Sequence, residues 1–100
     1  MFAVTTAKGP AWDHGSSIRD QARWDEHAAF ANGLVDNGVV VLGGPVEDDD
    51  VNVVALLAVM ATDEQEVRSL FAADPWIEAG ILVLASVRSW TMWLGQYPRS

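Results

Sequence analysis

Residues 53–60 read VVALLAVM, an apolar run without a single polar side chain. Its β-branched and aliphatic residues favour a strand, and the run is too short to span a bilayer, which takes about 20 residues. A strand with one face in water alternates apolar and polar residues, and this run does not alternate. We therefore predict a strand over residues 52–61 with both of its faces covered.

A helix is predicted directly after this strand. Thr62 is followed three residues later by Gln65, which is the pattern of a capping box at the start of a helix. The helix is expected to run to residue 72 or 73, because Pro75 disfavours the helical conformation at Asp74. Two consecutive elements, a strand and a helix, are thus expected in the second half of the chain.

The remaining elements follow from β-branched runs, helical periodicity and turn residues. They are a strand over residues 2–6, a loop over 7–17, a helix from 18 or 19 to 36, a strand over 39–42 that Gly43-Gly44-Pro45 ends, and a strand over 80–87. The order strand–helix–strand–strand–helix–strand predicts an α+β, ferredoxin-like fold, in which an antiparallel four-stranded sheet carries two helices on one face. One domain over residues 1–100 is expected, with a tail over about 91–100.

The sheet pattern also predicts a partner. Residues 81–85 read ILVLA and, like residues 53–60, have no polar side chain on either face. Helices can cover only one face of this sheet, so the other needs a second cover. Two sheets packed face to face about a twofold axis would supply it. We expect a homodimer through the open sheet face, which is a dimeric α+β barrel.

Composition excludes several classes of function. The net charge is −8 and there are only six Lys and Arg residues, so nucleic acid and anionic membranes are poor partners. The chain has no cysteine, which excludes disulfides, thiolate catalysis and cysteine-based zinc sites. Residues 1–6 lack the charged start and the long apolar core of a signal peptide, so a cytoplasmic location is expected.

His27 is the most informative polar residue of the first predicted helix. It shares an apolar stripe with residues three and four positions apart, namely Trp24, Ala28, Ala31, Leu34 and Val35. A buried imidazole needs a polar partner, since an unsatisfied buried polar group costs roughly 1–3 kcal/mol. Asp74 is the candidate: its carboxylate would fix one ring nitrogen and leave the other free as a general base or acid.

Each of these two residues also has a purely structural interpretation. His27 can be a satisfied residue of the hydrophobic core. Asp74 can be an N-cap, with Pro75 at the first position of a further helical turn. Both alternatives stay open on the residues alone.

Four segments together resemble the YCII-related family: WDEHAAF at 24–30, LGGP at 42–45, ADPWIEAGI at 73–81 and VRSW at 87–90. They occur in the family's order and cover most of the chain. The resemblance implies a ferredoxin-like fold, a dimeric α+β barrel and a candidate active site that contains His27 and Asp74. It also implies small enzymes that eliminate from, or rearrange, ring-derived substrates. Some members carry an arginine three residues before the histidine, where this chain has Trp24, with Arg23 one residue further back.

Six residues are candidates for contact with a small-molecule ligand: Trp12, Arg23, Trp24, Gly44, Pro45 and Trp76. The tryptophans would exclude water from the site, with Trp12 as a lid, or they simply belong to the core. Arg23, and also Arg19, would bind a substrate carboxylate or form surface ion pairs. Gly44 and Pro45 would form a backbone wall beside the ligand or only a turn.

No metal or cofactor site is expected. The acidic run at 47–50 lacks the spacing of a calcium loop, His14 and His27 have no common helical register, and no glycine-rich phosphate loop is present. The sequence therefore favours a small cofactor-independent enzyme that uses His27 and Asp74 for elimination or isomerisation on a ring-derived or carbonyl substrate. The alternative is a non-catalytic small-molecule-binding or accessory module in which His27 is structural.

Overall fold

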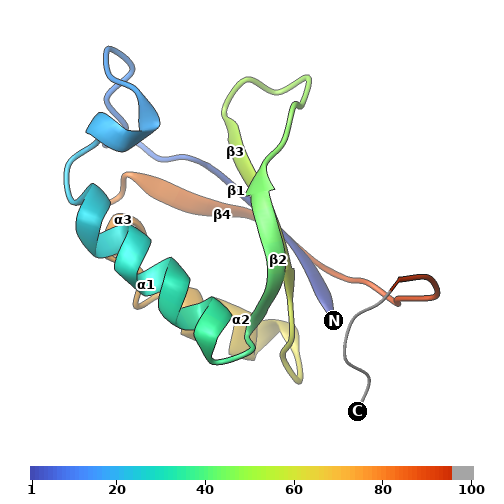
Figure 1. The fold of residues 1–100 in the computed structure, drawn as a ribbon. Helices are drawn as coiled ribbons and strands as arrows, with labels where there is room; N and C mark the ends of the chain where they lie inside the picture. The colour runs from blue at the N-terminus through green and yellow to red at the C-terminus, as the bar shows by residue number, and fades with distance from the viewer. Residues whose placement is uncertain (96–100) are drawn as a thin grey trace.

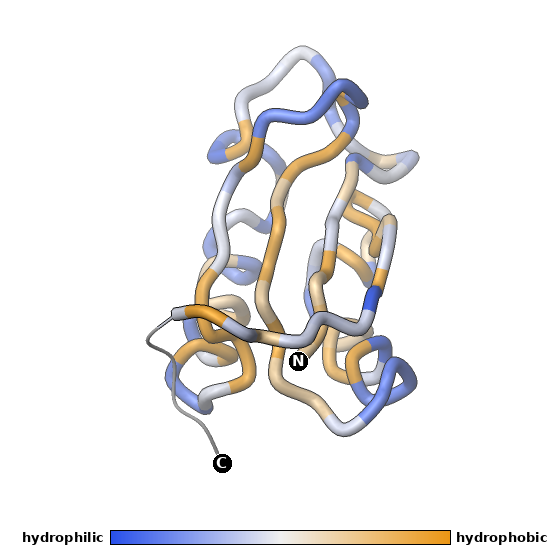
Figure 2. Tube along the Cα trace, turned by 90° about the vertical axis from the view of Figure 1, so that its right-hand side faces the viewer, coloured by the Kyte–Doolittle hydropathy of each residue, from blue (hydrophilic) through white to orange (hydrophobic). Residues whose placement is uncertain are grey.

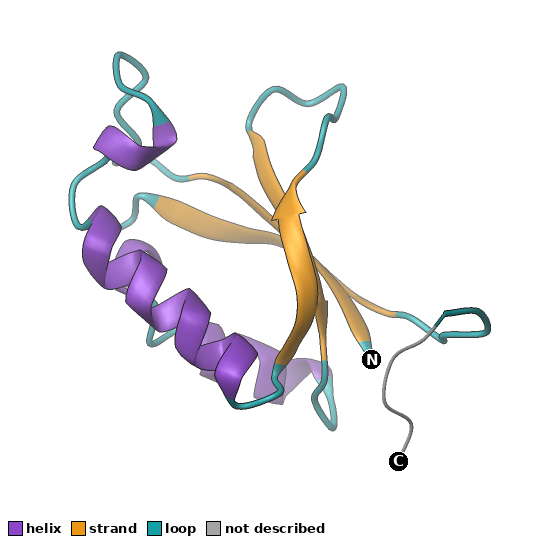
Figure 3. Cartoon of the chain, in the orientation of Figure 1, coloured by secondary structure: helices purple, strands orange, loops and turns teal. Residues whose placement is uncertain are grey.

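The computed structural model describes residues 1–95 and has four strands in one antiparallel sheet, in the order β2-β3-β1-β4. The elements are β1 (Phe2–Lys8), the 3-10 turn η1 (Ile18–Asp20), α1 (Trp24–Asp36), β2 (Val40–Pro45), β3 (Val53–Val59), α2 (Glu64–Phe71), α3 (Pro75–Glu78) and β4 (Leu82–Ser89). The helices lie on one side of the sheet (Figures 1 and 3). The predicted ferredoxin-like α+β fold is confirmed.

The first helix begins later than predicted. α1 starts at Trp24, and the preceding Ile18–Asp20 form a separate turn. Arg23 separates the two, because its backbone is left-handed (φ 61°) and cannot continue a right-handed helix. Residues 18 to 36 are therefore not one helix, although the apolar stripe around His27 falls within α1.

The second strand runs further than predicted. Gly43 and Gly44 lie within the ladder and Pro45, which pairs with Ala55, is the last residue of β2, so the strand continues through the segment that was predicted to end it. β2 is an edge strand of the sheet, where a proline without an N–H is tolerated. Gly43 packs closely against β3, since a Cβ there would overlap the terminal methyl group of Leu57 unless that side chain moved.

The helix cap after β3 is shifted by one residue from the prediction. Asp63, and not Thr62, is the N-cap of α2, and its side chain accepts a hydrogen bond from the Glu66 N–H at 2.8 Å. The Glu66 carboxylate in turn accepts from the Thr62 N–H at 3.1 Å. Gln65 takes no part in this exchange. The carboxylates of Asp63 and Glu66 thus make the two capping contacts that were predicted for Thr62 and Gln65.

The core lies between the helices and the sheet in two clusters. The larger contains Val4, Leu34, Val40, Val59, Val67 and Phe71. The smaller contains Trp12, Trp76, Ile81 and Leu82 and adjoins the start of α1 through Trp24. This smaller aromatic cluster supports His27.

The face of the sheet turned away from the helices carries exposed apolar side chains. In the view onto this face, β3 is hydrophobic along its whole length (Figure 2). Leu57 packs against the core, so its neighbour Leu56 points to the open face, where it is exposed together with Leu42 and Val83. The predicted tail over 91–100 lies partly outside the described residues. Within residues 1–95, no helix is long and apolar enough to cross a membrane.

Candidate active site

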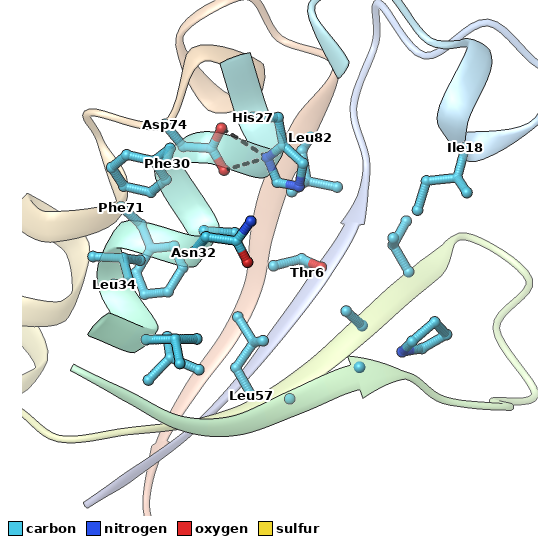
Figure 4. A pocket seen from close by; sticks show the side chains of 18 of the residues that line it. Thr6, Ile18, His27, Phe30, Asn32, Leu34, Leu57, Phe71, Asp74 and Leu82 are labelled. Carbon is cyan, nitrogen blue, oxygen red and sulfur yellow. Dashed lines mark hydrogen bonds and ion pairs between the residues drawn. The ribbon is translucent and has the colours of Figure 1, made fainter. Parts of the chain in front are cut away.

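His27 and Asp74 are in direct contact. The imidazole Nδ1 lies 3.0 Å from Oδ1 and 2.9 Å from Oδ2 of Asp74 (Figure 4). α1 supplies the imidazole, and the residue before α3 supplies the carboxylate. Asp74 is only 2% exposed, whereas the His27 side chain is 18% exposed. The carboxylate is thus the buried member of the pair, and the imidazole is the member that solvent or a ligand can reach.

Asp74 is also the N-cap of α3. Its Oδ1 accepts a hydrogen bond from the Trp76 N–H at 2.9 Å, and Pro75 occupies the first turn of the helix. Asp74 therefore caps α3 and contacts His27 at the same time. The cap fixes the carboxylate in place, and the fixed carboxylate then orients the ring of His27.

The imidazole lies flat on the indole of Trp76. The ring centroids are 3.9 Å apart and the planes differ by 3°. Trp76 is fully buried, and its Nε1 donates a hydrogen bond to the Ala22 carbonyl at 2.7 Å. Trp12 packs edge-on against the same indole at 5.8 Å, and Trp24 packs against it at 5.6 Å. The plane of the imidazole is consequently held by packing as well as by Asp74.

The contact with Asp74 determines which ring nitrogen is available. A carboxylate can only accept hydrogen bonds, so Nδ1 of His27 carries the proton that it donates. In the neutral ring, Nε2 then has a free lone pair. Figure 4 shows Nε2 directed away from Asp74 into a cavity. This geometry suits a group that accepts a proton from a ligand.

The cavity has a volume of about 450 Å³ and lies between α1 and the sheet. Its apolar wall includes Trp24, Phe30, Leu34, Leu57, Phe71 and Leu82. The polar side chains that line it are Thr6, Arg19, His27, Asn32 and Asp74. Small-molecule sites typically have this size and this mixture of an apolar wall with a few polar groups.

Three of the six predicted ligand-contacting residues line this cavity, namely Trp24, Gly44 and Pro45. Trp76 and Trp12 are not among the lining residues. They pack behind the imidazole, with Trp76 directly under the ring and Trp12 behind Trp76. Trp12 is 9% exposed, so it is part of the core and does not form a lid.

The loop that carries Trp12 is held by local hydrogen bonds. The buried side chain of Gln21 accepts from the Asp13 N–H at 2.9 Å and donates to the Asp13 carbonyl at 2.8 Å. The Asp13 carboxylate accepts from the Gly15 N–H and the Ser16 hydroxyl, and these two bonds lower its pKa. His14 is exposed in this loop and does not line the cavity.

The two arginines near His27 differ in position. Arg23 pairs with Glu26 at 2.8 Å, donates to the Pro75 carbonyl at 3.2 Å and lies outside the cavity. Arg19 lines the cavity, with its guanidinium 5.8 Å from the centre of the Trp24 ring. Within residues 1–95, Arg19 forms no ion pair. Geometry therefore favours Arg19 over Arg23 for contact with a ligand.

Thr6 and Asn32 were not selected as candidates from the sequence. Both line the cavity, Thr6 from β1 and Asn32 from α1. Alternate residues of a strand share a face, so Thr6 lies on the same side of β1 as Val4, which is fully buried. The sequence signal that could have identified Thr6 was a polar residue on the core-facing side of a strand.

The fold and the cavity define a ferredoxin-like α+β domain with a candidate small-molecule site. A family model for the YCII-related domain matches residues 3–91, and the chain belongs to this family. Among solved structures, it is similar to the 5-chloro-2-hydroxyhydroquinone dehydrochlorinase TftG from Burkholderia phenoliruptrix, in complex with 2,5-dihydroxybenzoquinone. The two chains are 25% identical with a TM-score of 0.54, and the match covers 91% of this chain and 94% of that one. No curated protein sequence matches the chain.

The Asp74→Asn variant tests the assignment of the imidazole proton. Asparagine preserves an N-cap for α3, but its amide can donate to Nδ1, which removes the preference for a proton on that nitrogen. We expect the neutral His27 ring to carry its proton on Nδ1 in the native protein and to shift toward Nε2–H in the variant. Nitrogen-15 NMR of the imidazole distinguishes the two tautomers.

The matched control is Asp63→Asn, which changes the N-cap of α2 without touching His27. It should leave the His27 tautomer unchanged. A native ring protonated on Nε2 would contradict the assignment.

Proposed function

We propose that the chain is a small cofactor-independent enzyme that uses His27 and Asp74 for acid–base chemistry on a small ring-derived or carbonyl substrate. The observation that carries this proposal is the orientation of the imidazole, whose Nδ1 is held by Asp74 while Nε2 is open to the cavity. Membership of the YCII-related family and the similarity to a dehydrochlorinase support an elimination, with isomerisation as a related outcome of the same proton transfer.

In the proposed elimination, Nε2 of His27 takes a proton from a ring hydroxyl or an acidic C–H of the substrate. The electron pair of the broken bond forms a new C=O or C=C bond, and the leaving group departs with the electron pair of its own bond. The substrate thus loses one proton and one anion, with no oxidant or reductant. In an isomerisation, the imidazolium instead returns the proton to another ring atom.

Asp74 stabilises the imidazolium that forms. Its carboxylate lies 2.9 Å from Nδ1 and is almost fully buried, so the charge on the ring is neutralised at short range. The stacked Trp76 keeps the ring from turning away from the substrate. A positioned general base of this kind typically contributes about 10²–10⁴-fold in rate.

The apolar wall of the cavity would exclude water from the reacting atoms, and Arg19 would meet negative charge on the ligand. With a net charge of −8, the protein as a whole repels anions. A local guanidinium that lines the cavity is therefore the natural contact for an anionic ring.

The non-catalytic alternative uses the same contacts differently. Asp74 caps α3, and His27 packs on Trp76, so both residues contribute to the fold. In a binding module, substitution of His27 would reduce stability and ligand affinity, and no turnover would depend on it.

Turnover by the His27→Gln and Asp74→Asn variants separates these alternatives. With 5-chloro-2-hydroxyhydroquinone and related hydroxylated rings as substrates, we expect kcat to fall about 10²–10⁴-fold in each variant, because the base or its orienting partner is lost. Circular dichroism and size-exclusion chromatography should show that the fold and assembly persist. Native kcat in both variants would refute the catalytic role.

Arg19→Gln should raise KM for an anionic substrate roughly five- to tenfold, since it removes the guanidinium from the cavity wall but leaves the base in place. Arg23→Gln is the matched control, because Arg23 is held by Glu26 and Pro75 outside the cavity. Its KM should stay close to that of the native protein. Equal effects of the two substitutions would argue against a specific contact through Arg19.

We also propose that a second copy of the chain covers the open sheet face. Leu42, Leu56 and Val83 are exposed there, and a face of this kind is a typical interface between identical subunits. Leu56→Glu should convert the dimer to monomers in light scattering, because it places a charge within the apolar face. Val51→Glu, in the exposed β2–β3 loop, is the control and should stay dimeric. A monomeric native protein at micromolar concentration would refute this assembly.

A further inference from the structure

Thr6 is a buried residue with an unused hydroxyl. The residue is 3% exposed, and its Oγ1 has no hydrogen-bond partner among residues 1–95. Among residues 1–95, Oγ1 of Thr6 is the one buried side-chain polar atom without a hydrogen-bond partner. Buried hydroxyls in proteins are almost always hydrogen-bonded, so an orphaned one calls for an explanation.

Packing alone would favour valine at this position. Valine has nearly the shape of threonine, and Val4 occupies the preceding position on the same side of β1. Replacing an unsatisfied polar atom with a methyl group removes its desolvation penalty. Threonine is thus the less stable choice for the empty protein, which points to a role in binding.

The backbone around Thr6 is irregular on both sides. The register of β1 with β4 shifts between Thr5 and Thr6, and the register with β3 shifts between Thr6 and Ala7. Such bulges re-aim a side chain and are common next to binding sites. Thr6 lines the same cavity as His27 and lies between His27 and Leu57 in the close view (Figure 4).

We propose that Thr6 is a specificity-determining residue whose hydroxyl binds an oxygen substituent on the ring of the ligand. The inference rests on the proposed function, in that it takes the cavity beside His27 as the substrate site. In the empty site, Oγ1 is shielded from solvent. A rotation about Cα–Cβ between staggered conformers exchanges the hydroxyl with the methyl group and brings Oγ1 to the ligand.

The chemistry of the hydroxyl defines the ligand class. A threonine hydroxyl donates one hydrogen bond and accepts others, so it recognises a ring carbonyl or ring hydroxyl and gains little from a halogen or a hydrocarbon edge. The imidazole of His27 takes a proton from a first position on the ligand, and Thr6 binds a second oxygen. The site is therefore expected to select planar rings with at least two oxygen substituents over rings with one.

The test compares the binding of 2,5-dihydroxybenzoquinone and of phenol by isothermal titration calorimetry. Thr6→Val should weaken binding of 2,5-dihydroxybenzoquinone about tenfold, because a buried hydrogen bond is lost, and should leave binding of phenol unchanged. The same variant should melt at a higher temperature than the native protein. Thr6→Ser, which keeps the hydroxyl, should bind 2,5-dihydroxybenzoquinone within about threefold of the native protein.

His27→Gln separates failure of this inference from failure of the proposed function. If His27→Gln weakens binding of 2,5-dihydroxybenzoquinone and Thr6→Val does not, Thr6 has no role in specificity, and the cavity beside His27 remains the ligand site that the proposed function requires. If the native protein does not bind 2,5-dihydroxybenzoquinone, or if Thr6→Val binds it as tightly as the native protein, the inference about Thr6 is overturned, whereas the proposed function is judged separately by the kcat of His27→Gln. An equal loss of both ligands in Thr6→Val would show a general packing effect and would also refute the inference.

Discussion

The carboxylate of Asp74 links the fold of this chain to its candidate site. It is almost completely buried, and an ionised carboxylate is tolerated there only if donors surround it. One donor is the Trp76 N–H at the start of α3, and the other is Nδ1 of His27 in α1. The position of α1 against α3 and the direction of the imidazole ring are thus set by the same atoms. Loss of the carboxylate would disturb both.

The cavity exists because the elements around it leave the space between α1 and the β2 side of the sheet incompletely filled. Small residues line this side, among them Gly43, Gly44 and Ala55. Large aromatic side chains fill the space on the other side of His27, where Trp12 and Trp76 pack against one another. The imidazole therefore has packed aromatic side chains on one side and the cavity on the other.

The sequence was sufficient to predict the order of the strands and main helices, and it named Asp74 as the candidate partner of His27, with a structural role for each residue left open. Apolar runs in β3 and helical spacing in α1 are local patterns, and each led to the correct element. The errors came from features that depend on tertiary context. The left-handed backbone at Arg23 interrupts the helical pattern and accompanies a side chain that pairs with Glu26 and Pro75. Pro45 remains in a strand only because that strand is at the edge of the sheet.

The residues that line the cavity were harder to predict than the contact between His27 and Asp74. Whether Trp12 and Trp76 support the imidazole or line the cavity depends on which side of the ring they occupy, and no spacing rule gives that information. Thr6 is not distinguished by the sequence for a similar reason. Its type is ordinary in a strand, and its significance appears only when the surrounding atoms show that its hydroxyl has no partner.

The double role of Asp74 has a consequence for how related sequences are interpreted. A chain that has lost its chemistry still needs a cap for α3 and a donor for the buried carboxylate, so selection for folding alone would retain the aspartate and the histidine. The presence of both residues in a sequence is therefore not by itself evidence of catalysis. Under the proposed role of Thr6, its hydroxyl does not stabilise the empty protein, and a residue of this kind would then separate ligand-binding members of the family from the others better than the aspartate and histidine do.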